Sequence, residues 1–230
     1  MEKRFSQGLT FLTTYTYGKA MSDNPGWAGG GQGLSSAGAQ NILNLKAEKG
    51  LADLDHRRRF TVASVYELPF LKNSHGFVKQ VVAGWATDAI IQVQSGLPIT
   101  PQFSGDIGQM GTAQALRPDL VCNPNLPSDQ QTVERFFNTS CLVQQNPIRF
   151  GTSGRAVITG PGTVGVDLAA RKNFAFLNEK WKLQFRSEFF NAINHSNFNP
   201  PTKTLGNANF GRISGARDPR IIQFGLKLAF

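Results

Sequence analysis

Cysteine, histidine and charged residues are all scarce in this sequence of 230 residues. It has 2 cysteines and 3 histidines, and 17% of its residues are charged, against roughly 25% in an average soluble protein. Two cysteines exclude a small scaffold that several disulfides hold together. No apolar run approaches the roughly 18 residues of a membrane-spanning helix. The first residues have Thr and Tyr where a signal peptide has its apolar run, so we expect no signal peptide.

The excess of basic residues does not predict a protein that binds nucleic acid. Lys and Arg number 24 and Asp and Glu number 15, which gives a formal net charge of +9. Proteins that bind nucleic acid gather their cations on one element. Here the only tight cluster is Arg57–Arg59, and no helix-turn-helix or zinc-ligand spacing accompanies it. We therefore expect no nucleic-acid partner.

Alternation of apolar and polar residues is the strongest pattern in the sequence. In the last segment Ile222, Phe224 and Leu226 fall on one side of the chain, while Gln223 and Lys227 fall on the other. This is the period of a β-strand with one apolar face. The same pattern recurs and predicts an all-β fold, an antiparallel up-and-down meander of six long strands. We place these strands at residues 4–17, 58–69, 84–95, 163–173, 181–190 and 220–230.

The connections between these strands alternate between long and short. A compact soluble domain rarely holds structureless loops above about 15 residues, whereas outer-membrane barrels have long extracellular loops and short periplasmic turns. Tyr15 and Phe60 fall at the long-loop ends of the strands, and Trp85 and Trp181 at the short-turn ends. Two aromatic belts are typical of two membrane interfaces. The sequence predicts a transmembrane β-barrel in the outer membrane of a Gram-negative bacterium.

The second face of the predicted strands is polar. In a large barrel this face lines the lumen, and in a soluble sandwich it meets water. Alternation alone does not separate the two, so a soluble secreted β-sandwich that binds a ligand stays as an alternative. The predicted lumen face consists of Asp88, Gln92, Asp167, Arg171, Lys182, Gln184, Arg186, Glu188, Gln223 and Lys227.

Several strings in this order resemble one family of receptors. They include Ala52–Phe60 (ADLDHRRRF), Gln94–Thr100 (QSGLPIT), Arg117–Leu120 (RPDL), Phe185–His195 (FRSEFFNAINH) and Gln223–Phe230 (QFGLKLAF). Together they resemble the C-terminal part of the Oar-like TonB-dependent receptors of Acidobacteria-type genomes. The resemblance implies a barrel of about 22 strands with an N-terminal plug, in which TonB supplies energy for uptake.

Six strands are too few for a barrel, because about eight is the practical minimum. We therefore expect this chain to be the C-terminal segment of such a receptor, without a plug and inactive alone. TonB would then act only through the missing plug. The ligand stays unknown. A surface or adhesion protein of the same family, without transport, is the alternative.

A few residues are candidates for specific roles. The apolar terminal strand, with Phe224, Leu226, Leu228 and Phe230, predicts a signal for the barrel-assembly machinery. Cys122 and Cys141 fall in one long loop and predict a disulfide after export, with two free thiols as the alternative; such a loop closure stabilises by about 3 kcal/mol.

The residues before the second predicted strand are charged, but we assign no metal-binding or catalytic role to them. Asp53, Asp55 and His56 have hard ligands for a cation, yet polar contacts at a loop junction explain them equally. Arg57–Arg59 could meet lipopolysaccharide phosphates, or simply water. We expect outer-membrane lipid and lipopolysaccharide as partners, with no metal, no cofactor and no catalytic residues, because no paired carboxylates or Ser/His/Asp set appears.

Overall fold

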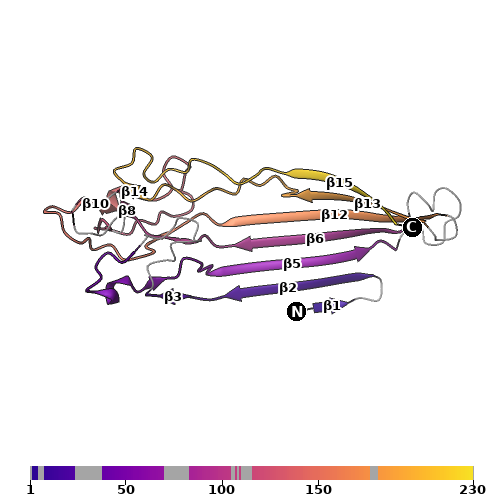
Figure 1. Cartoon of the computed structure of the whole chain (residues 1–230), viewed down its shortest axis with the longest axis horizontal. Helices are drawn as coiled ribbons and strands as arrows, with labels where there is room; N and C mark the ends of the chain where they lie inside the picture. The colour runs from indigo at the N-terminus through magenta and orange to yellow at the C-terminus, as the bar shows by residue number, and fades with distance from the viewer. Residues whose placement is uncertain are drawn as a thin grey trace.

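An antiparallel meander of strands organises the molecule. The computed structural model describes residues 2–4, 8–23, 38–69, 83–104, 107, 109, 116–176 and 181–229. Its main sheet has seven strands, in the order β1-β2-β5-β6-β12-β13-β15, so strands adjacent in the sheet follow one another along the chain (Figure 1). The all-β antiparallel fold is therefore confirmed. The strands are β1 (Glu2–Arg4), β2 (Leu9–Tyr17), β5 (Arg58–Glu67), β6 (Trp85–Gln94), β12 (Thr163–Phe176), β13 (Trp181–Phe190) and β15 (Ile221–Ala229).

Two of the predicted strand boundaries are wrong. In the segment predicted as one strand, residues 4–17, β2 covers only Leu9–Tyr17, and Arg4 belongs to the separate strand β1, which pairs antiparallel with β2 and places Glu2 opposite Leu12. The sheet therefore has six long strands and one short one. Strand β12 does not end at residue 173 but continues to Phe176, because its last residues still pair with β13, as Phe174 does with Leu183.

The sheet is open in the part of the chain that the structure describes. Its edges are β1 and β15, which lie at opposite ends of the strand order. No helix among the described residues is long and apolar enough to span a membrane. Five of the six long strands have 9 or 10 residues, and β12 has 14; a tilted strand needs roughly 9–11 residues to cross a bilayer.

The three long connections leave the same end of the sheet and fold together into a cap (Figure 1). We define the cap as the described residues of 18–57, 95–162 and 191–220. Short strands pair within it: β3 (Met21–Ser22) with β4 (Gly50–Leu51), β7 (Pro98–Ile99) with β11 (Ile158–Thr159), β8 (Gln102–Phe103) with β14 (Thr204–Leu205), and β9 (Asp119–Leu120) with β10 (Leu142–Val143). Two 3-10 helices complete it, η1 (Leu45–Glu48) and η2 (Thr139–Cys141).

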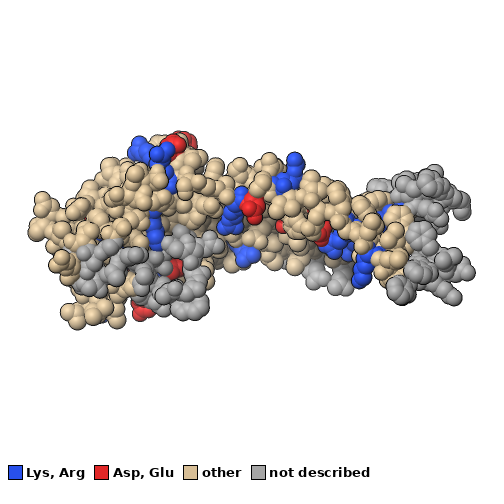
Figure 2. Space-filling model, turned by 45° about the horizontal axis from the view of Figure 1, so that its top comes forward, with Lys and Arg blue, Asp and Glu red and all other residues tan. Residues whose placement is uncertain are grey.

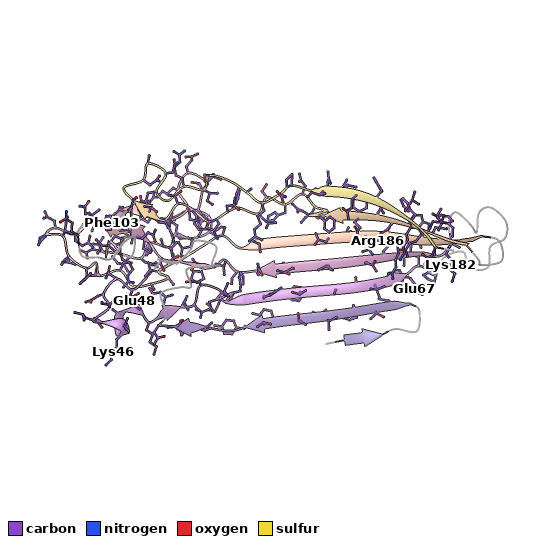
Figure 3. The ribbon with its side chains drawn as sticks, viewed as in Figure 1. Lys46, Glu48, Glu67, Phe103, Lys182 and Arg186 are labelled. Carbon is purple, nitrogen blue, oxygen red and sulfur yellow. A yellow bond between two sulfur atoms is a disulfide. The ribbon has the colours of Figure 1, made fainter. Side chains whose placement is uncertain are left out.

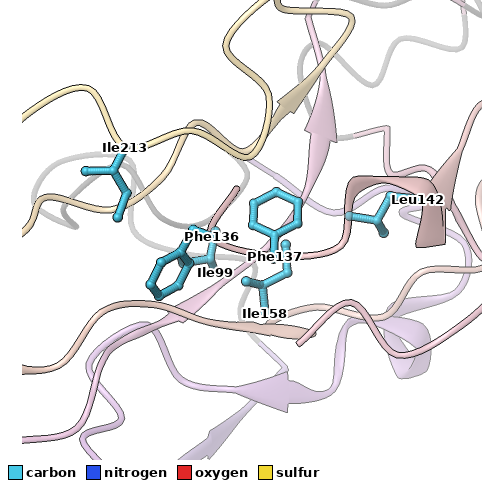
Figure 4. Packing of buried hydrophobic residues seen from close by; sticks show 6 residues of the cluster. All are labelled: Ile99, Phe136, Phe137, Leu142, Ile158 and Ile213. Atoms are coloured by element: carbon cyan, nitrogen blue, oxygen red, sulfur yellow. The ribbon is translucent and has the colours of Figure 1, made fainter. Parts of the chain in front are cut away.

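The buried hydrophobic core lies in the cap and not in the sheet. All of the buried hydrophobic side chains among the described residues belong to the second and third long loops. Phe137 packs at its centre and meets Phe210 edge to face, with ring centroids 5.2 Å apart. Because these loops bury apolar groups together, they form a body of their own rather than the structureless connections that their composition suggested. The central cluster is Ile99, Phe136, Phe137, Leu142, Ile158 and Ile213 (Figure 4).

A buried ion pair joins the first long loop to the second. The Arg117 guanidinium lies 2.6 Å from the Glu48 carboxylate, and the two residues are 1% and 0% exposed. The other Glu48 oxygen accepts the Gln40 backbone N–H at 3.0 Å, and Arg117 Nε donates to the Ser153 carbonyl at 2.9 Å. Arg155 donates to the Glu48 backbone carbonyl at 3.0 Å. A buried charge pair is tolerated only when such additional hydrogen bonds satisfy it.

The third loop brings a half-buried lysine to the first loop. Burial, the larger cause, lowers the pKa of Lys203 from 10.5 to about 8, against the attraction of Asp53. Asp53 also lies 3.5 Å from the Arg155 guanidinium. Loss of charge is therefore easier for Lys203 in the folded cap than in the unfolded chain.

We predict that Arg117→Met destabilises the cap by about 3–5 kcal/mol, because it leaves the buried Glu48 charge without a counter-ion. Pulse proteolysis in urea would measure this change. Arg149→Met is the matched control, since Arg149 pairs with Asp119 at 2.8 Å on the cap surface and an exposed pair contributes about 1 kcal/mol or less. Equal urea midpoints for the two variants would contradict the prediction.

We predict that the cap becomes more stable as the pH rises from about 8 toward 10.5. In this window the folded chain has released the Lys203 proton and the unfolded chain still holds it, so stability rises with pH. Lys203→Met should raise the urea midpoint at pH 7 and should lose this advantage by pH 10. Lys46→Met, at an exposed lysine of the cap (Figure 3), controls for the removed charge. If Lys203→Met raised the urea midpoint equally at pH 7 and at pH 10, the role of Lys203 would be refuted.

Candidate functional site

One face of the main sheet is apolar across all of its long strands. The register aligns Tyr15, Phe60, Val93 and Val164 in one row, from β2 to β12. A second row, nearer the short turns, places Leu183 of β13 beside Phe174 and Leu228. Side chains alternate between the two faces of a strand, so these rows fix which residues share the apolar face. In the described residues no second large sheet covers this face, since the other sheets have two strands each.

The apolar face is strongly exposed on β15, an edge strand of the sheet. Phe224 is 70% and Leu226 is 71% exposed. Phe185 stacks on Phe224 with ring centroids 6.2 Å apart and meets Trp85 edge to face at 6.1 Å. A soluble sandwich would bury such side chains against a second sheet. A face of this kind needs an apolar solvent, which a lipid bilayer provides.

Lys172 is a cation on the apolar face that was not among the candidate residues of the sequence analysis. It pairs with Trp85 and Phe185 in the register. Its Nζ donates to the Ala83 carbonyl at 2.6 Å and lies over the rings of Trp85 and Phe174 at 5.6 and 5.1 Å. Its position near the short turns suits a lysine that reaches from apolar surface toward an interface.

The opposite face of the sheet is polar, and the register places all ten residues of the predicted lumen face on it. One row runs from Asp88 through Ala169 and Glu188 to Gln223. Along the strands, Lys and Arg side chains lie next to Asp and Glu side chains (Figure 2). Glu67 and Lys182 mark the end near the short turns (Figure 3).

Charges of opposite sign compensate one another on this polar face. Arg171 lies 3.6 Å from Asp88, and Arg186 lies 2.6 Å from Glu188. Glu188 also accepts a hydrogen bond from Gln223. A row of paired charges with water-facing amides is suited to a polar wall along which a ligand or water passes.

Near the cap, hydrogen bonds extend the polar face. Arg59 donates to the Gln92 side chain at 3.2 Å, and Gln92 donates to Gln94 at 3.0 Å. Arg58 falls on the other face, next to Tyr17 in the register, and Arg57 lies 3.7 Å from Asp55. The Arg57–Arg59 run is thus divided among different surroundings and is not one patch.

The three residues weighed as a cation site contact protein groups instead. Asp55 accepts the Ala20 backbone N–H at 2.7 Å, Asp53 pairs with Arg155, and His56 Nδ1 lies 2.7 Å from the Ser95 carbonyl oxygen. The contacts of Asp53 and His56 tie the first loop to the second, and the contact of Asp55 lies within the first loop. Within the described ranges no group of three or more His, Cys, Asp or Glu residues could hold a metal ion.

Cys122 and Cys141 are joined by a disulfide in the cap, with Cα atoms 4.8 Å apart. The bridge lies beside the β9–β10 pair, where Val121 N–H donates to the Cys141 carbonyl at 2.9 Å. Hydrogen bonds from Arg149 hold the pKa of the nearby Asp119 carboxyl below its usual value of 3.8. The disulfide therefore closes a loop that hydrogen bonds already order.

A pocket of about 250 Å³ lies where the cap meets the sheet. A second pocket of about 350 Å³ adjoins it and shares Pro161 and Phe198. Next to the lining residues Thr163 and Phe198, the Asn197 side chain accepts from the Val164 N–H and donates to the Val164 carbonyl, both at 2.8 Å. A side chain at Gly96 would overlap the Gly160 carbonyl, so close packing there requires glycine. The first pocket is lined by Leu54, His56, Gln94, Ser95, Leu97, Gly160, Pro161, Thr163, Phe198, Pro200 and Arg217.

Comparison with known proteins agrees with the two-faced sheet. Residues 1–223 match the family described as outer membrane beta barrel domain. No curated protein and no solved structure gives a match. The family match covers all of β1 to β13 and the first residues of β15. The alternative of a soluble β-sandwich is therefore set aside, and the chain belongs to the outer membrane beta-barrel domain family, in the outer membrane of a Gram-negative bacterium.

Proposed function

We propose that this sheet is part of the barrel of an Oar-like TonB-dependent receptor, which takes up a ligand across the outer membrane. The observation that carries the proposal is the division of one sheet into an apolar and a charged face in matching register. In this proposal the apolar face contacts lipid and the ten polar residues line the ligand's path. The proposal contains no catalytic step and needs no cofactor.

Closing the barrel requires more strands than the seven described. An open edge in lipid leaves backbone N–H and C=O groups without partners, and each such group costs several kcal/mol. Further strands must therefore pair with β1 and with β15. The family resemblance supplies them as a barrel of about 22 strands, whose plug would contact TonB.

Two surfaces fit the remaining proposed partners. Arg58 stands on the apolar face at the cap end of β5, next to Tyr17, where a lipopolysaccharide phosphate would meet a lipid-facing arginine. The apolar row of β15, with Phe224, Leu226 and Leu228, is the proposed signal for the barrel-assembly machinery. Phe230, predicted as its last member, lies outside the described residues.

We predict that Phe224→Asp lowers the amount of folded chain in the outer membrane several-fold, because it turns a charge toward lipid. Gly225→Asp is the matched control: it adds the same charge one residue on, opposite Arg186 and with open space around it. The measurement is the outer-membrane fraction and its heat-modifiable migration on a gel. If both variants assemble equally well, β15 does not present this row to lipid.

A surface or adhesion role is the second candidate, and the cap supplies the observation that favours it. Leu43 is 91% exposed, and its neighbours Ile42 and Leu45 are also exposed. Apolar side chains gathered on a surface loop are typical of contact with another surface. This role would need the barrel only as an anchor.

We predict that cells of the source bacterium carry the cap on an outer-membrane polypeptide far larger than 25.1 kDa, and that this polypeptide cross-links to TonB. An antiserum against the cap would detect both bands after in vivo cross-linking, and a strain without TonB is the control. A large polypeptide with no TonB band, together with weaker cell attachment of a Leu43→Ser strain, would replace uptake by adhesion.

A further inference from the structure

The pocket at the junction of cap and sheet stands at the cap end of the polar face. Gln94 and Thr163 are opposite each other in the register, at the ends of β6 and β12. Both share the face of Gln92, by strand alternation. The first loop adds His56, and the third adds Arg217. All three long loops therefore meet at the position where a molecule would pass from the cap to the polar face.

The described lining of this pocket is positive. Arg217 and His56 line it, and no acidic residue is among its described lining residues. His56 Nδ1 donates its proton to the Ser95 carbonyl oxygen at 2.7 Å, because a carbonyl oxygen can only accept, and this holds the ring in place as part of the pocket wall. Arg59 contributes further positive charge through its hydrogen bond to Gln92.

The rest of the lining is apolar and suits a short hydrophobic body. Leu97 and Phe198 form its walls together with prolines. Ligand sites combine such walls with a few polar groups that fix orientation. A volume of about 250 Å³ is at the small end of such sites, so the occupant is small.

We propose that this pocket binds a small organic anion, whose carboxylate meets Arg217 and whose apolar body packs on Leu97 and Phe198. Arginine matches a carboxylate with two parallel hydrogen bonds, which sets it apart from a lysine at such a site. The proposal deepens the proposed function by naming a ligand class, and only the onward passage of the anion rests on that function.

The test uses the full chain, purified in detergent from the outer membrane, with 4-fluorobenzoate as the probe. Fluorine NMR would follow its line width. We expect millimolar binding, weakened about tenfold or more by Arg217→Gln, because hydrogen bonds to charged groups are the strong ones. Arg135→Gln, which removes an exposed cap arginine that lines neither pocket, should bind as the parent chain does. Heat-modifiable migration on a gel would show that each variant is folded.

Two further probes separate the parts of the proposal. Neutral 4-fluorobenzamide should bind less tightly than 4-fluorobenzoate in the parent chain, and inorganic phosphate should compete weakly. Equal loss in Arg217→Gln and Arg135→Gln, or equal binding of acid and amide, would overturn the anion site. Phosphate that competes as well as benzoate would overturn the role of the apolar wall. Binding without a TonB cross-link would leave this site standing while the uptake function fails.

Discussion

Backbone hydrogen bonding in lipid is the constraint on which the rest of this structure depends. A strand in a bilayer must pair on both sides because no water is present to satisfy its N–H and C=O groups. The meander meets this need between β2 and β13 by joining each strand to the next along the chain. Once pairing is fixed, alternation fixes both faces at once, so that the row of Phe60 and Val93 faces one solvent and the row of Asp88 and Glu188 the other.

In the described part of the chain the sheet has no buried hydrophobic core of its own, so the close packing of this protein is found in the cap. The strands need no buried interior of their own, because lipid can cover one face. The long loops instead bury Phe137 and Ile158 together and hold Glu48 against Arg117 with no exposure. Such a network fixes the shape of the cap, because a buried charge is stable only in the arrangement in which its ionic and hydrogen-bonding partners surround it. Loops that are fixed in this way can form a pocket with rigid walls.

Most of the sheet could be predicted from the sequence, because a period of two is readable in single strands. The ten polar residues predicted together do share one face, and Cys122 does reach Cys141. The separate strand β1 could not be foreseen, since three residues are too few to show a period. Lys172 escaped for a related reason: a lysine near an expected turn carries no sign that two aromatic rings will enclose it.

The cap could not be predicted from sequence patterns, because its contacts join loops that are distant in the sequence. Gln40 bonds the Arg117 backbone across 77 positions, and Arg155 reaches Glu48 across 107. Residue pairs so far apart in the sequence produce no local periodicity from which they could be predicted. The pocket at the cap base has the same origin, since Arg217 and His56 approach it from different loops while Gln94 comes from a strand. The regular sheet thus supplies one fixed edge of the pocket, and the irregular loops supply most of the side chains that line it. Under the proposed function, this division would let one barrel frame accept different ligands, because changes in loop residues alter the pocket without altering a single strand pairing.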